Sequence, residues 1–499
     1  MSTPLNRVLP PPVAESDSTP VSGRLSSGVL GTSDIVFMVM AAAAPMGVVV
    51  TLLPMAFAFG NGAGVPGTYL GAIGAMLLFA VGYVRIIPFV QNAGAFYAYI
   101  AASVGRTCGL SAAYVAAFSY FALSASTLAA LAFFCELLFQ RLTGLKLHWS
   151  VWAFAGLALA SWLSYHRITL AARVLGFALA AEVALILLLD LAILTHIGLK
   201  GLDVLDFTPT RILAPGLGVA AIYAFNGVLG VEGTAIYQEE ARRPEVTVPR
   251  ATYIAVVFVG LFYVFTAWCL ASAAGADRVS AVTKSDPGAF VVNQSLEHLG
   301  AWGADAVSVL VLTSSFAAVL GLFNSSARYL YALGRDGVLP RAMGHTHPKH
   351  RSPHIAGWVL TVALLIVLVL SALAGLDPLT NVATALVGLG SVGLMALLAI
   401  TALTIPVFFA RRGMFGLGVT VAPGVGGLVI AAATVLAFLN YSVLTGVDSV
   451  VINRLPYALI ALAAFGVCQA HWLKRKNPAL YLRIASTRID DGPGSQVSP

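Results

Sequence analysis

Charged side chains are scarce in this sequence. Asp, Glu, Lys and Arg make up 10% of its 499 residues, and 59% of the residues are hydrophobic. Soluble domains contain about 25% charged residues, so the composition excludes an ordinary soluble protein. One protein core could not bury this much apolar surface, whereas a lipid bilayer can cover it. We therefore expect an integral membrane protein.

Cysteine pairs and nucleotide-binding motifs are missing as well. The 4 cysteines form no CxxC pair, which argues against a zinc site or a disulfide framework. No P-loop is present, and the Gly-x-Gly-x-x-Gly match at residues 388–393 lies inside an apolar run without a preceding strand. The net charge of +7 comes from short loops rather than from one basic face, so we expect no nucleic acid partner. We also expect no metal and no cofactor other than a coupling ion.

Long apolar runs are what the sequence has in abundance. A helix that spans a bilayer needs about 20 predominantly apolar residues, and runs near that length recur between short polar joints. We expect an all-α protein with 12 transmembrane helices. The expected spans are residues 33–59, 67–89, 109–139, 149–165, 171–196, 215–238, 251–274, 303–323, 354–375, 379–410, 418–440 and 455–473.

The positions of Lys and Arg indicate the orientation. With the N-terminus inside, 21 of these residues fall in cytosolic segments and 7 fall outside, which together account for all 28. Cytosolic loops of membrane proteins carry the excess of positive charge. We therefore expect a multi-pass protein of the plasma membrane with both termini in the cytosol. Residues 1–30 are expected to be a disordered tail, and residues 476–499 a second cytosolic tail.

Two of the expected spans contain helix-breaking residues near their middle. Span 1 carries AAAAPMGVVV at residues 41–50, and span 6 carries FNGVLGVEG at residues 225–233. Backbone groups that are freed inside a bilayer are tolerated only where they line a cavity or hold a ligand. Breaks at matching positions in two five-helix groups are typical of inverted-repeat transporters with a binding site at the midplane. A packing notch between helices is the alternative for either segment.

The two breaks would also supply complementary charge. A helix that starts after a break points free N–H groups and a positive dipole end at an anion. A helix that ends before a break offers carbonyl groups to a cation. A zwitterionic amino acid needs both, so the pair of breaks favours such a ligand.

Three further segments carry a family resemblance. The segment GVEGTAIYQEEARRPEVTVPRA at residues 230–251 contains a Glu-Glu pair, a proline and a closing Pro-Arg-Ala. NSSARYLYALGRDGVLP at residues 324–340 looks like a cytosolic loop after span 8, and GAFYAYI at residues 94–100 is similar to a segment after span 2. Together they resemble the amino acid–polyamine–organocation (APC) superfamily of permeases, of the amino acid permease type. The first break of that family is usually Gly-x-Gly, whereas Pro45 and Gly47 stand here.

The resemblance implies a leucine-transporter-type fold, with a 5+5 inverted repeat in which helices 1 and 6 are broken. It implies a single transporter domain at residues 31–475. The two repeats would occupy about residues 31–200 and 210–412, and helices 11 and 12 about residues 415–475.

The resemblance also implies substrate contacts at the two breaks. Backbone amides after the first break would bind a substrate carboxylate, and carbonyl groups before the breaks would bind the amino group. Phe225 would be an aromatic gate on the extracellular side, or else an ordinary packing residue. The expected substrate-binding residues are Ala43, Ala44, Pro45, Met46, Gly47, Val48, Tyr223, Phe225, Asn226 and Gly227.

Three acidic residues lie within the expected spans 5 and 6. Span 5 enters the membrane near Ala171, so a rise of 1.5 Å per residue puts Glu182 about 16 Å deep. Ionisable residues at that depth usually serve ion or proton pathways, although a hydrogen bond to a neighbouring helix is the alternative. We expect Glu182 to be the coupling residue and Asp190 to lie nearer the entrance. Glu232 in span 6 either holds the inward gate or bonds a neighbouring helix.

Hydroxyl groups occupy the middle of span 8, in LTSSF at residues 312–316. In related sodium-coupled transporters a hydroxyl pair on this helix helps to bind sodium, which makes Thr313 and Ser314 candidate coupling residues. The alternative is that these hydroxyls bond back to the preceding helical turn.

The sequence thus predicts a secondary active transporter. It would take up an amino acid or related amine across the plasma membrane by proton symport with alternating access. A sodium symporter and an exchanger are the alternatives, and a channel or a membrane-embedded enzyme is more remote. The expected partners are the small-molecule substrate and the bilayer, and the chain is expected to be a monomer or a homodimer.

Overall fold

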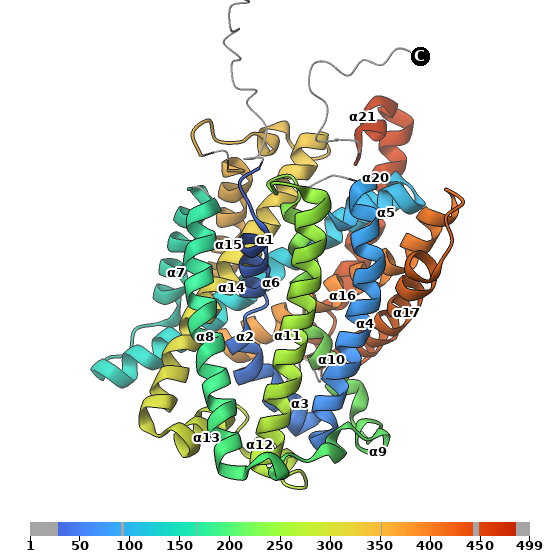
Figure 1. Ribbon diagram of the computed structural model, residues 1–499. Helices are drawn as coiled ribbons and strands as arrows, with labels where there is room; N and C mark the ends of the chain where they lie inside the picture. The colour runs from blue at the N-terminus through green and yellow to red at the C-terminus, as the bar shows by residue number, and fades with distance from the viewer. Residues whose placement is uncertain (1–27, 91–93, 167, 351, 443–448, 486–499) are drawn as a thin grey trace, which may run out of the picture.

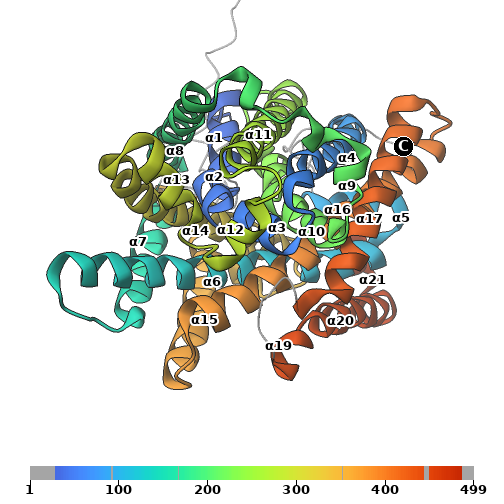
Figure 2. The ribbon, with the colours of Figure 1, turned by 90° about the horizontal axis from the view of Figure 1, so that it is seen from below.

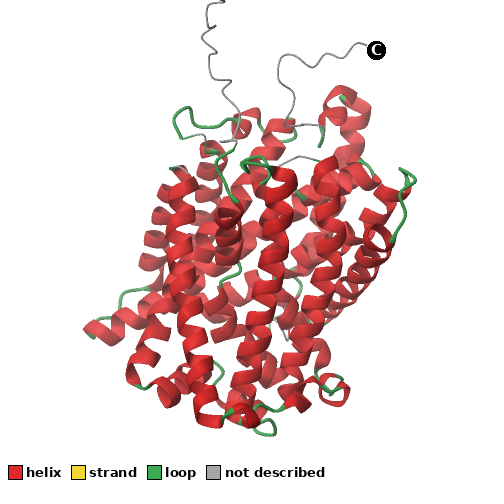
Figure 3. Ribbon diagram, viewed as in Figure 1, coloured by secondary structure: helices red, strands yellow, loops and turns green. Residues whose placement is uncertain are grey.

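The computed structural model describes residues 28–90, 94–166, 168–350, 352–442 and 449–485. Every regular element in these ranges is a helix, and no strand is present there (Figures 1 and 3). Eleven helices in the same ranges are long and apolar enough to cross a membrane. The expectation of an all-helical, multi-pass membrane protein is therefore confirmed, whereas the count of 12 spans stays a prediction. The expected tails were residues 1–30 and 476–499, of which residues 1–27 and 486–499 lie outside the described residues. The described part of the second tail contains a short helix, α21 (Pro478–Arg483).

The first half of the chain begins with a span that is interrupted between α1 and α2. Its helices are α1 (Thr32–Ala42), α2 (Pro45–Gly47), the π-helix η1 (Val48–Leu52), α3 (Leu53–Phe59), η2 (Gly62–Gly64), α4 (Val65–Ile86), η3 (Ile87–Phe89), α5 (Phe96–Val104), α6 (Arg106–Thr143), α7 (Trp149–Tyr165) and α8 (Ile168–Ile197). Pro66 lies in the first turn of α4, where its missing N–H costs nothing, and Gly144 ends α6 with a φ of 72°.

The second half contains another interrupted helix. Its helices are η4 (Leu199–Gly201), η5 (Val204–Phe207), α9 (Pro209–Ile212), α10 (Leu217–Gly227), the 3-10 helix η6 (Val231–Tyr237), α11 (Pro244–Ala274), α12 (Val279–Ser285), α13 (Phe290–Leu299), α14 (Ala301–Asp336), η7 (Arg341–Gly344), α15 (His354–Leu373), the π-helix η8 (Pro378–Ala383) and α16 (Thr384–Ala410). The chain then continues with the π-helix η9 (Leu417–Val421), α17 (Ala422–Leu439), α19 (Val450–Asn453), α20 (Pro456–Lys476) and α21 (Pro478–Arg483).

Helix α14 is longer than the sequence predicts. The segment at residues 324–340 was expected as a loop, but α14 runs on to Asp336 and ends before Gly337, whose φ is 84°. The helix can continue because the two arginines in this stretch, Arg328 and Arg335, form ion pairs with carboxylates of another segment. The expectation of a loop here was wrong because these partners are distant in the sequence.

The two broken spans lie side by side in opposite directions. Seen from below, α2, α3 and α10 lie near the middle of the bundle, and α7, α15, α17 and α20 lie at its periphery (Figure 2). Helices η1 and α3 pack against α10, whereas α1 packs against η6. The second part of span 1 therefore contacts the first part of span 6, and the first part of span 1 contacts the second part of span 6. This arrangement places the two breaks close together.

Backbone hydrogen bonds fasten the two broken spans at one end. The amides of Val29 and Leu30 both donate to the carbonyl of Glu240, at 3.0 Å each. The amide of Arg242 donates in return to the carbonyl of Leu30, at 2.9 Å. The chain before α1 and the chain after η6 thus form one small backbone junction, which we call the Glu240 junction.

Candidate functional site

A residue in the left-handed conformation marks each break. Ala44 lies between α1 and α2 with φ 49° and ψ 69°, and Gly230 lies between α10 and η6 with φ 105°. This conformation costs an alanine about 1 kcal/mol and a glycine almost nothing. Pro45 then starts α2, at a position that tolerates its missing N–H. The first break is therefore opened by a strained alanine, and proline begins the helix after it.

A carboxylate lies at the first break. The amide of Met46 in α2 donates to Glu182 Oε2 of α8 at 3.4 Å. The side chain of Ser314 on α14 lies beside the same carboxylate, and all three residues are buried. The structure thus brings together Met46, Glu182 and Ser314 from three separate helices. Glu182 occupies the kind of position at a helix N-terminus where an anion is stabilised.

A second carboxylate lies at the second break. Glu232 Oε2 accepts a hydrogen bond from the amide of Gly230 at 2.8 Å, and its Oε1 accepts one from the Tyr120 hydroxyl at 3.1 Å. The backbone carbonyl of Glu232 accepts a hydrogen bond from the Tyr83 hydroxyl at 2.7 Å. Each break therefore has an amide whose partner is a buried carboxylate, although Glu232 is held by two tyrosines that the sequence did not point to.

The two broken spans touch at Gly227. A Cβ atom at this position would lie 3.0 Å from Val48 Cγ1 and 3.3 Å from the Tyr69 hydroxyl. That hydroxyl donates to the carbonyl of Tyr223 at 3.4 Å. A larger residue here would require Val48 and Tyr69 to shift by a few tenths of an ångström, so Gly227 favours the close contact of α10 with η1 and α4.

Several of the expected backbone contacts are already engaged. The amide of Ala43 donates to Val39, and the amide of Val48 donates to the carbonyl of Ala44. The carbonyl of Phe225 accepts a hydrogen bond from Val228, and that of Gly47 accepts one from the Thr51 hydroxyl. A ligand at the breaks would have to share or displace these bonds.

The hydroxyls of span 8 point in different directions. Ser314 is buried beside Glu182, whereas Thr313 is exposed and its hydroxyl donates to the carbonyl of Leu310 at 2.9 Å. Ser315 likewise bonds back to Val311 at 2.8 Å. Of the two hydroxyls expected to bind a coupling ion, Ser314 thus lies on a buried face of α14 and Thr313 on an exposed one.

Unsatisfied polar atoms lie around the breaks. Asn226 Nδ2 and the Tyr263 hydroxyl are buried and have no hydrogen-bond partner among the described residues. Tyr263 packs edge-on against Tyr69, with ring centroids 6.1 Å apart, and interacts electrostatically with Glu182. A buried polar group without a partner costs about 1–3 kcal/mol. Asn226 and Tyr263 thus each carry a buried polar atom that the described residues leave unsatisfied, and tyrosines inside apolar spans are the signal that could have revealed Tyr263.

No metal centre accompanies these groups. Within the part of the chain that the structure describes, no cluster of His, Cys, Asp and Glu could hold a metal ion. A cavity of about 670 Å³ opens between α8 and α11, but it is lined by apolar side chains such as Leu187, Phe258 and Leu261 and contains none of the residues at the breaks. This cavity is thus separate from the polar groups at the breaks.

Buried ion pairs close the end of the bundle near the Glu240 junction. Arg328 of α14 donates to both carboxylate oxygens of Glu240, at 2.9 to 3.1 Å, and its guanidinium lies 4.8 Å from the ring centroid of Tyr237. Arg335 forms a second bidentate pair with Glu239, at 2.8 Å. Burial raises the pKa of the Glu240 carboxyl, although Arg328 opposes the shift. We call this group the inner ion pairs.

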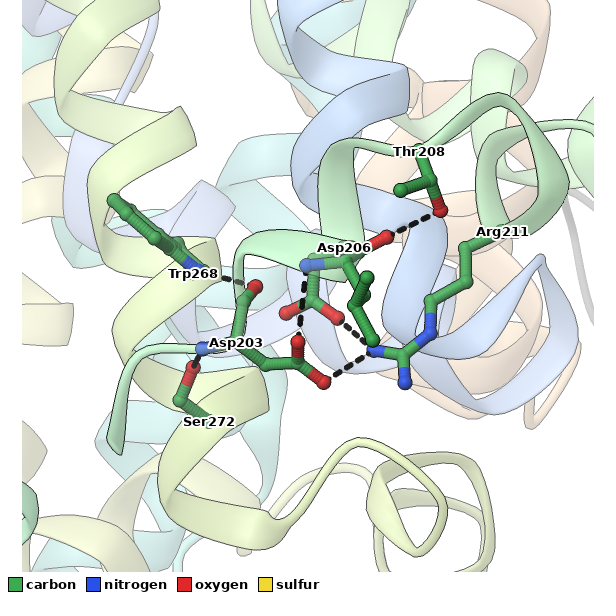
Figure 4. A network of polar contacts seen from close by, with 7 residues as sticks. Asp203, Asp206, Thr208, Arg211, Trp268 and Ser272 are labelled. Carbon is green, nitrogen blue, oxygen red and sulfur yellow. Dashed lines mark hydrogen bonds and ion pairs between the residues drawn. The ribbon is translucent and has the colours of Figure 1, made fainter. Parts of the chain in front are cut away.

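The opposite end is closed by a loop network between α8 and α10 (Figure 4). Arg211 Nη1 contacts Asp203 at 2.7 Å and Asp206 at 2.5 Å. Trp268 Nε1 donates to the carbonyl of Asp203, and the amide of Asp203 donates to the Ser272 hydroxyl, which ties the loop to α11. Burial raises the pKa of Asp206 to about 6, whereas a hydrogen bond from the amide of Leu205 helps to lower the pKa of Asp203. We call this group the outer loop network.

A family model described as "Amino acid permease" matches residues 30–465. The chain belongs to this family of permeases. The match covers both breaks, the inner ion pairs and the outer loop network, and it confirms the resemblance to the APC superfamily. The family is one of permeases, and the eleven long apolar helices of the described residues agree with a membrane setting.

Individual relatives in this family differ in what they transport. The chain is 22% identical over 143 residues to the branched-chain amino acid permease BcaP of Bacillus subtilis, a match that covers 29% of this chain and 30% of that protein. It is 26% identical over 327 residues to the low-affinity putrescine importer PlaP of Escherichia coli, which covers 62% of this chain and 68% of that protein. The match to the first relative thus spans less than a third of its length.

Solved structures support the leucine-transporter-type fold. MhsT in complex with L-phenylalanine superimposes with a TM-score of 0.56 at 16% identity, over 83% of this chain and 100% of that chain. A Na+-coupled sialic acid symporter gives a TM-score of 0.52 at 12% identity, over 83% of this chain and 90% of that chain. At these identities the comparison establishes the fold alone.

Proposed function

We propose that this permease is a secondary active transporter that takes up an amino acid or a related amine by proton symport with alternating access. Two supporting facts are its family and the two breaks, which lie side by side in the middle of the bundle. The two relatives named above are a branched-chain amino acid permease and a putrescine importer, and each of these substrates has at least one amino group. The substrate amino group would bind the carbonyl groups around Ala44 and Tyr223.

The contact between Met46 and Glu182 carries this proposal. When Glu182 is ionised, its carboxylate accepts the Met46 amide at the N-terminus of α2, which is also where a substrate carboxylate would bind. Protonation would weaken the hold of Glu182 on this amide and release it for the substrate. Proton binding and substrate binding would then favour each other, as symport requires. Glu232 holds its amide together with Tyr120 and would keep the second break in shape.

Sodium symport is the second candidate because Ser314 lies beside Glu182. A sodium site would combine a carboxylate, a hydroxyl and backbone carbonyl groups, all of which are oxygen ligands. However, Thr313 faces away from this position, so the hydroxyl pair of the sodium-coupled relatives is incomplete here. This observation favours the proton as the coupling ion. Exchange of one substrate for another would use the same site without net proton flux.

We also propose the plasma membrane as the location, with both chain ends in the cytosol. The excess of Lys and Arg on the side of the termini supports this orientation. Helix α21 lies at the same end of the bundle as the inner ion pairs, and α9, α12 and α13 lie at the opposite end (Figure 1). The inner ion pairs would then face the cytosol and the outer loop network the outside.

A reconstituted transport assay tests the proposal. Purified protein in liposomes that contain a pH-sensitive dye is exposed to a mixture of the common amino acids with putrescine. The wild type should acidify the lumen as substrate enters, and Glu182→Gln should abolish this acidification while leaving substrate exchange in place. Thr313→Val is the matched control, because its hydroxyl faces away from Glu182, and it should behave as the wild type. Unchanged proton flux in Glu182→Gln would rule out Glu182 as the coupling residue.

A second variant tests the position of the site. Gly47→Leu places a bulky side chain beside the amides of α2, and it should remove the thermal stabilisation that bound substrate gives. The same mixture of amino acids and putrescine is the probe, applied to wild type and variant in detergent. A normal substrate-induced shift in Gly47→Leu would place the binding site elsewhere.

A further inference from the structure

Helix α8 carries a second buried carboxylate, Asp190, which has no place in the coupling step described above. Its side chain is fully buried, and its Oδ2 accepts a hydrogen bond from the Thr266 hydroxyl of α11 at 2.8 Å. Its Oδ1 has no hydrogen-bond partner within the described ranges. The buried thiol of Cys269, three residues beyond Thr266, is its titratable neighbour on α11. Asp190 is thus an acid with one donor and one unsatisfied oxygen.

A structural role alone does not explain a carboxyl at this position. A charge inside the membrane is costly unless it is paired, and no ion pair to Asp190 occurs among the residues that the structure covers. Ionisation of this carboxyl inside the membrane is therefore costly. A serine or an asparagine could bond Thr266 equally well at lower cost. A carboxyl here is suited to gaining and losing a proton.

Asp190 and Glu182 are two stations along one helix interface. They are eight residues apart on α8, which corresponds to about 12 Å along the axis, and Asp190 is nearer the end that carries the outer loop network. Tyr263 and Thr266 are one turn apart on α11, and they face Glu182 and Asp190 respectively. The Tyr263 hydroxyl is buried and unpartnered in the described structure, so it is free to accept and donate a hydrogen bond.

The other side of the same interface is apolar. Leu187, Ile254 and Leu261 line the open cavity between α8 and α11, and these side chains are 42 to 59% exposed on the outer surface of the bundle. The carboxyls therefore face inward, while lipid tails would cover the outer face. Polar groups at this interface form a line that runs from Asp190 to the first break.

We propose that Asp190 is the outer proton acceptor of this permease and supplies the proton that reaches Glu182. A hydronium ion from the extracellular side gives its proton to the Asp190 carboxylate and leaves water. The proton then leaves Asp190, and the Tyr263 hydroxyl accepts one proton through an intervening water as it gives its own to the Glu182 carboxylate. Asp190 is again ionised, Tyr263 is unchanged and Glu182 is protonated. This inference rests on the proposed proton symport.

Asp190→Asn tests the proposal because asparagine keeps the shape and the Thr266 hydrogen bond but cannot carry the proton. Variants are reconstituted in liposomes with a pH gradient, and entry of the amino acid and putrescine mixture is followed together with lumenal pH. Proton-driven uptake should fall by at least about 10-fold. Exchange of labelled for unlabelled mixture at equal pH on both sides should stay within about 2-fold of the wild type, since no net proton movement is needed.

Two matched variants separate a proton role from a structural one. Thr266→Val removes the hydrogen bond but keeps the carboxyl, so proton-driven uptake should persist. Asp190→Glu restores a titratable group and should recover part of the uptake that Asp190→Asn loses. If Asp190 only ties α8 to α11, the ranking reverses, and Thr266→Val becomes the damaging change while Asp190→Asn is nearly silent.

Tyr263→Phe gives an independent reading, since it removes the relay without touching either carboxyl. It should slow proton-driven uptake and leave exchange in place. Proton flux in the wild type combined with normal flux in both Asp190→Asn and Tyr263→Phe would overturn this inference alone. A wild type that moves substrate without protons would overturn the proposed symport, and this inference with it.

Discussion

The two ends of the bundle are closed by charged groups in different surroundings. In the inner ion pairs, the side chains of Arg328 and Glu240 are each 3% exposed. In the outer loop network, Arg211 is 25% exposed and Asp203 is 29% exposed, although Asp206 is fully buried. Water screens an exposed ion pair, whereas a buried pair is strongly destabilised when one partner is removed. We expect the inner end to be held much more firmly than the outer end.

This difference bears on the transport cycle. In the proposed alternating-access cycle, the partly exposed pair of Arg211 and Asp203 would exchange its contact for water when the outer end opens, so breaking this contact would cost little. The inner ion pairs cannot separate until water or substrate reaches them, because each charge would otherwise be left unpaired in the bundle. In the proposed symport, binding of substrate and proton at the breaks would therefore supply the free energy that opens the inner end.

The largest expected effect comes from removing the carboxylate of the buried inner pair. Glu240→Ala leaves the Arg328 guanidinium buried without a counter-charge, which should lower the free energy of unfolding by about 3–5 kcal/mol. Thermal unfolding in detergent measures the loss. The backbone hydrogen bonds of the Glu240 junction do not involve this side chain, so they serve as the internal control. A shift no larger than that of a surface variant would show that the inner end is not the firmer one.

Asp206 should make the outer end sensitive to pH. Burial raises its pKa from about 3.8 to about 6 in the folded protein. The folded state therefore binds this proton more tightly than the unfolded state, and the stabilisation is fully present below about pH 4 and is lost as the pH rises through about 6. We expect this group to make the free energy of unfolding about 2 kcal/mol lower at pH 7 than at pH 4.5. Asp206→Asn should remove that difference, and an unchanged pH dependence would contradict the assignment.

The second inner pair should matter less than the first. Arg335 and Glu239 are 18% and 10% exposed, so water partly screens them. Glu239→Gln keeps the size of the side chain and removes its charge, and we expect a loss of about 1–2 kcal/mol in the free energy of unfolding. The experiment pairs it with Glu240→Gln in the same thermal assay. A larger effect at Glu239 than at Glu240 would reverse the ranking within the inner ion pairs.

The smallest effect is expected at Asp203. Its carboxylate is partly exposed and shares Arg211 with Asp206, so Asp203→Asn should cost less than about 1 kcal/mol. The backbone contacts of Asp203 with Trp268 and Ser272 remain in this variant. Salt titration of the unfolding temperature in wild type and variant would reveal the exposed pair, because added salt weakens it. A loss as large as that of Glu240→Ala would remove the contrast between the two ends.

Much of the fold could be predicted from the sequence because the bilayer imposes a simple pattern. Apolar runs located the long helices, and Pro45 with Gly47 marked the first break. These residues did not identify which position at the break departs from helical backbone angles. Ala44 adopts the left-handed conformation although alanine disfavours it. The packing of α1 and of α2 against α8 and α14 overrides this local preference.

The site was less predictable because partners distant in sequence decide it. Depth in span 5 singled out Glu182, but nothing in the sequence connected it to the amide of Met46. The rotation of α14 separates Ser314 from Thr313, which are neighbours in sequence. Tyr263 could not be distinguished from other tyrosines in apolar spans. The roles of Glu182, Thr313 and Ser314 in coupling and of Met46 in substrate binding stay predictions.

Glu240 connects the two broken helices to each other and to α14. The backbone carbonyl of Glu240 accepts hydrogen bonds from the amides of Val29 and Leu30, at the start of span 1. The Glu240 carboxylate forms the ion pair with Arg328 on α14. The inner halves of both broken helices are thus attached to the rest of the bundle through the same residue. A swing of one half would draw the other with it, and separation of the two inner ion pairs would release both. Such a permease should disfavour lopsided intermediates in which only one broken helix has moved.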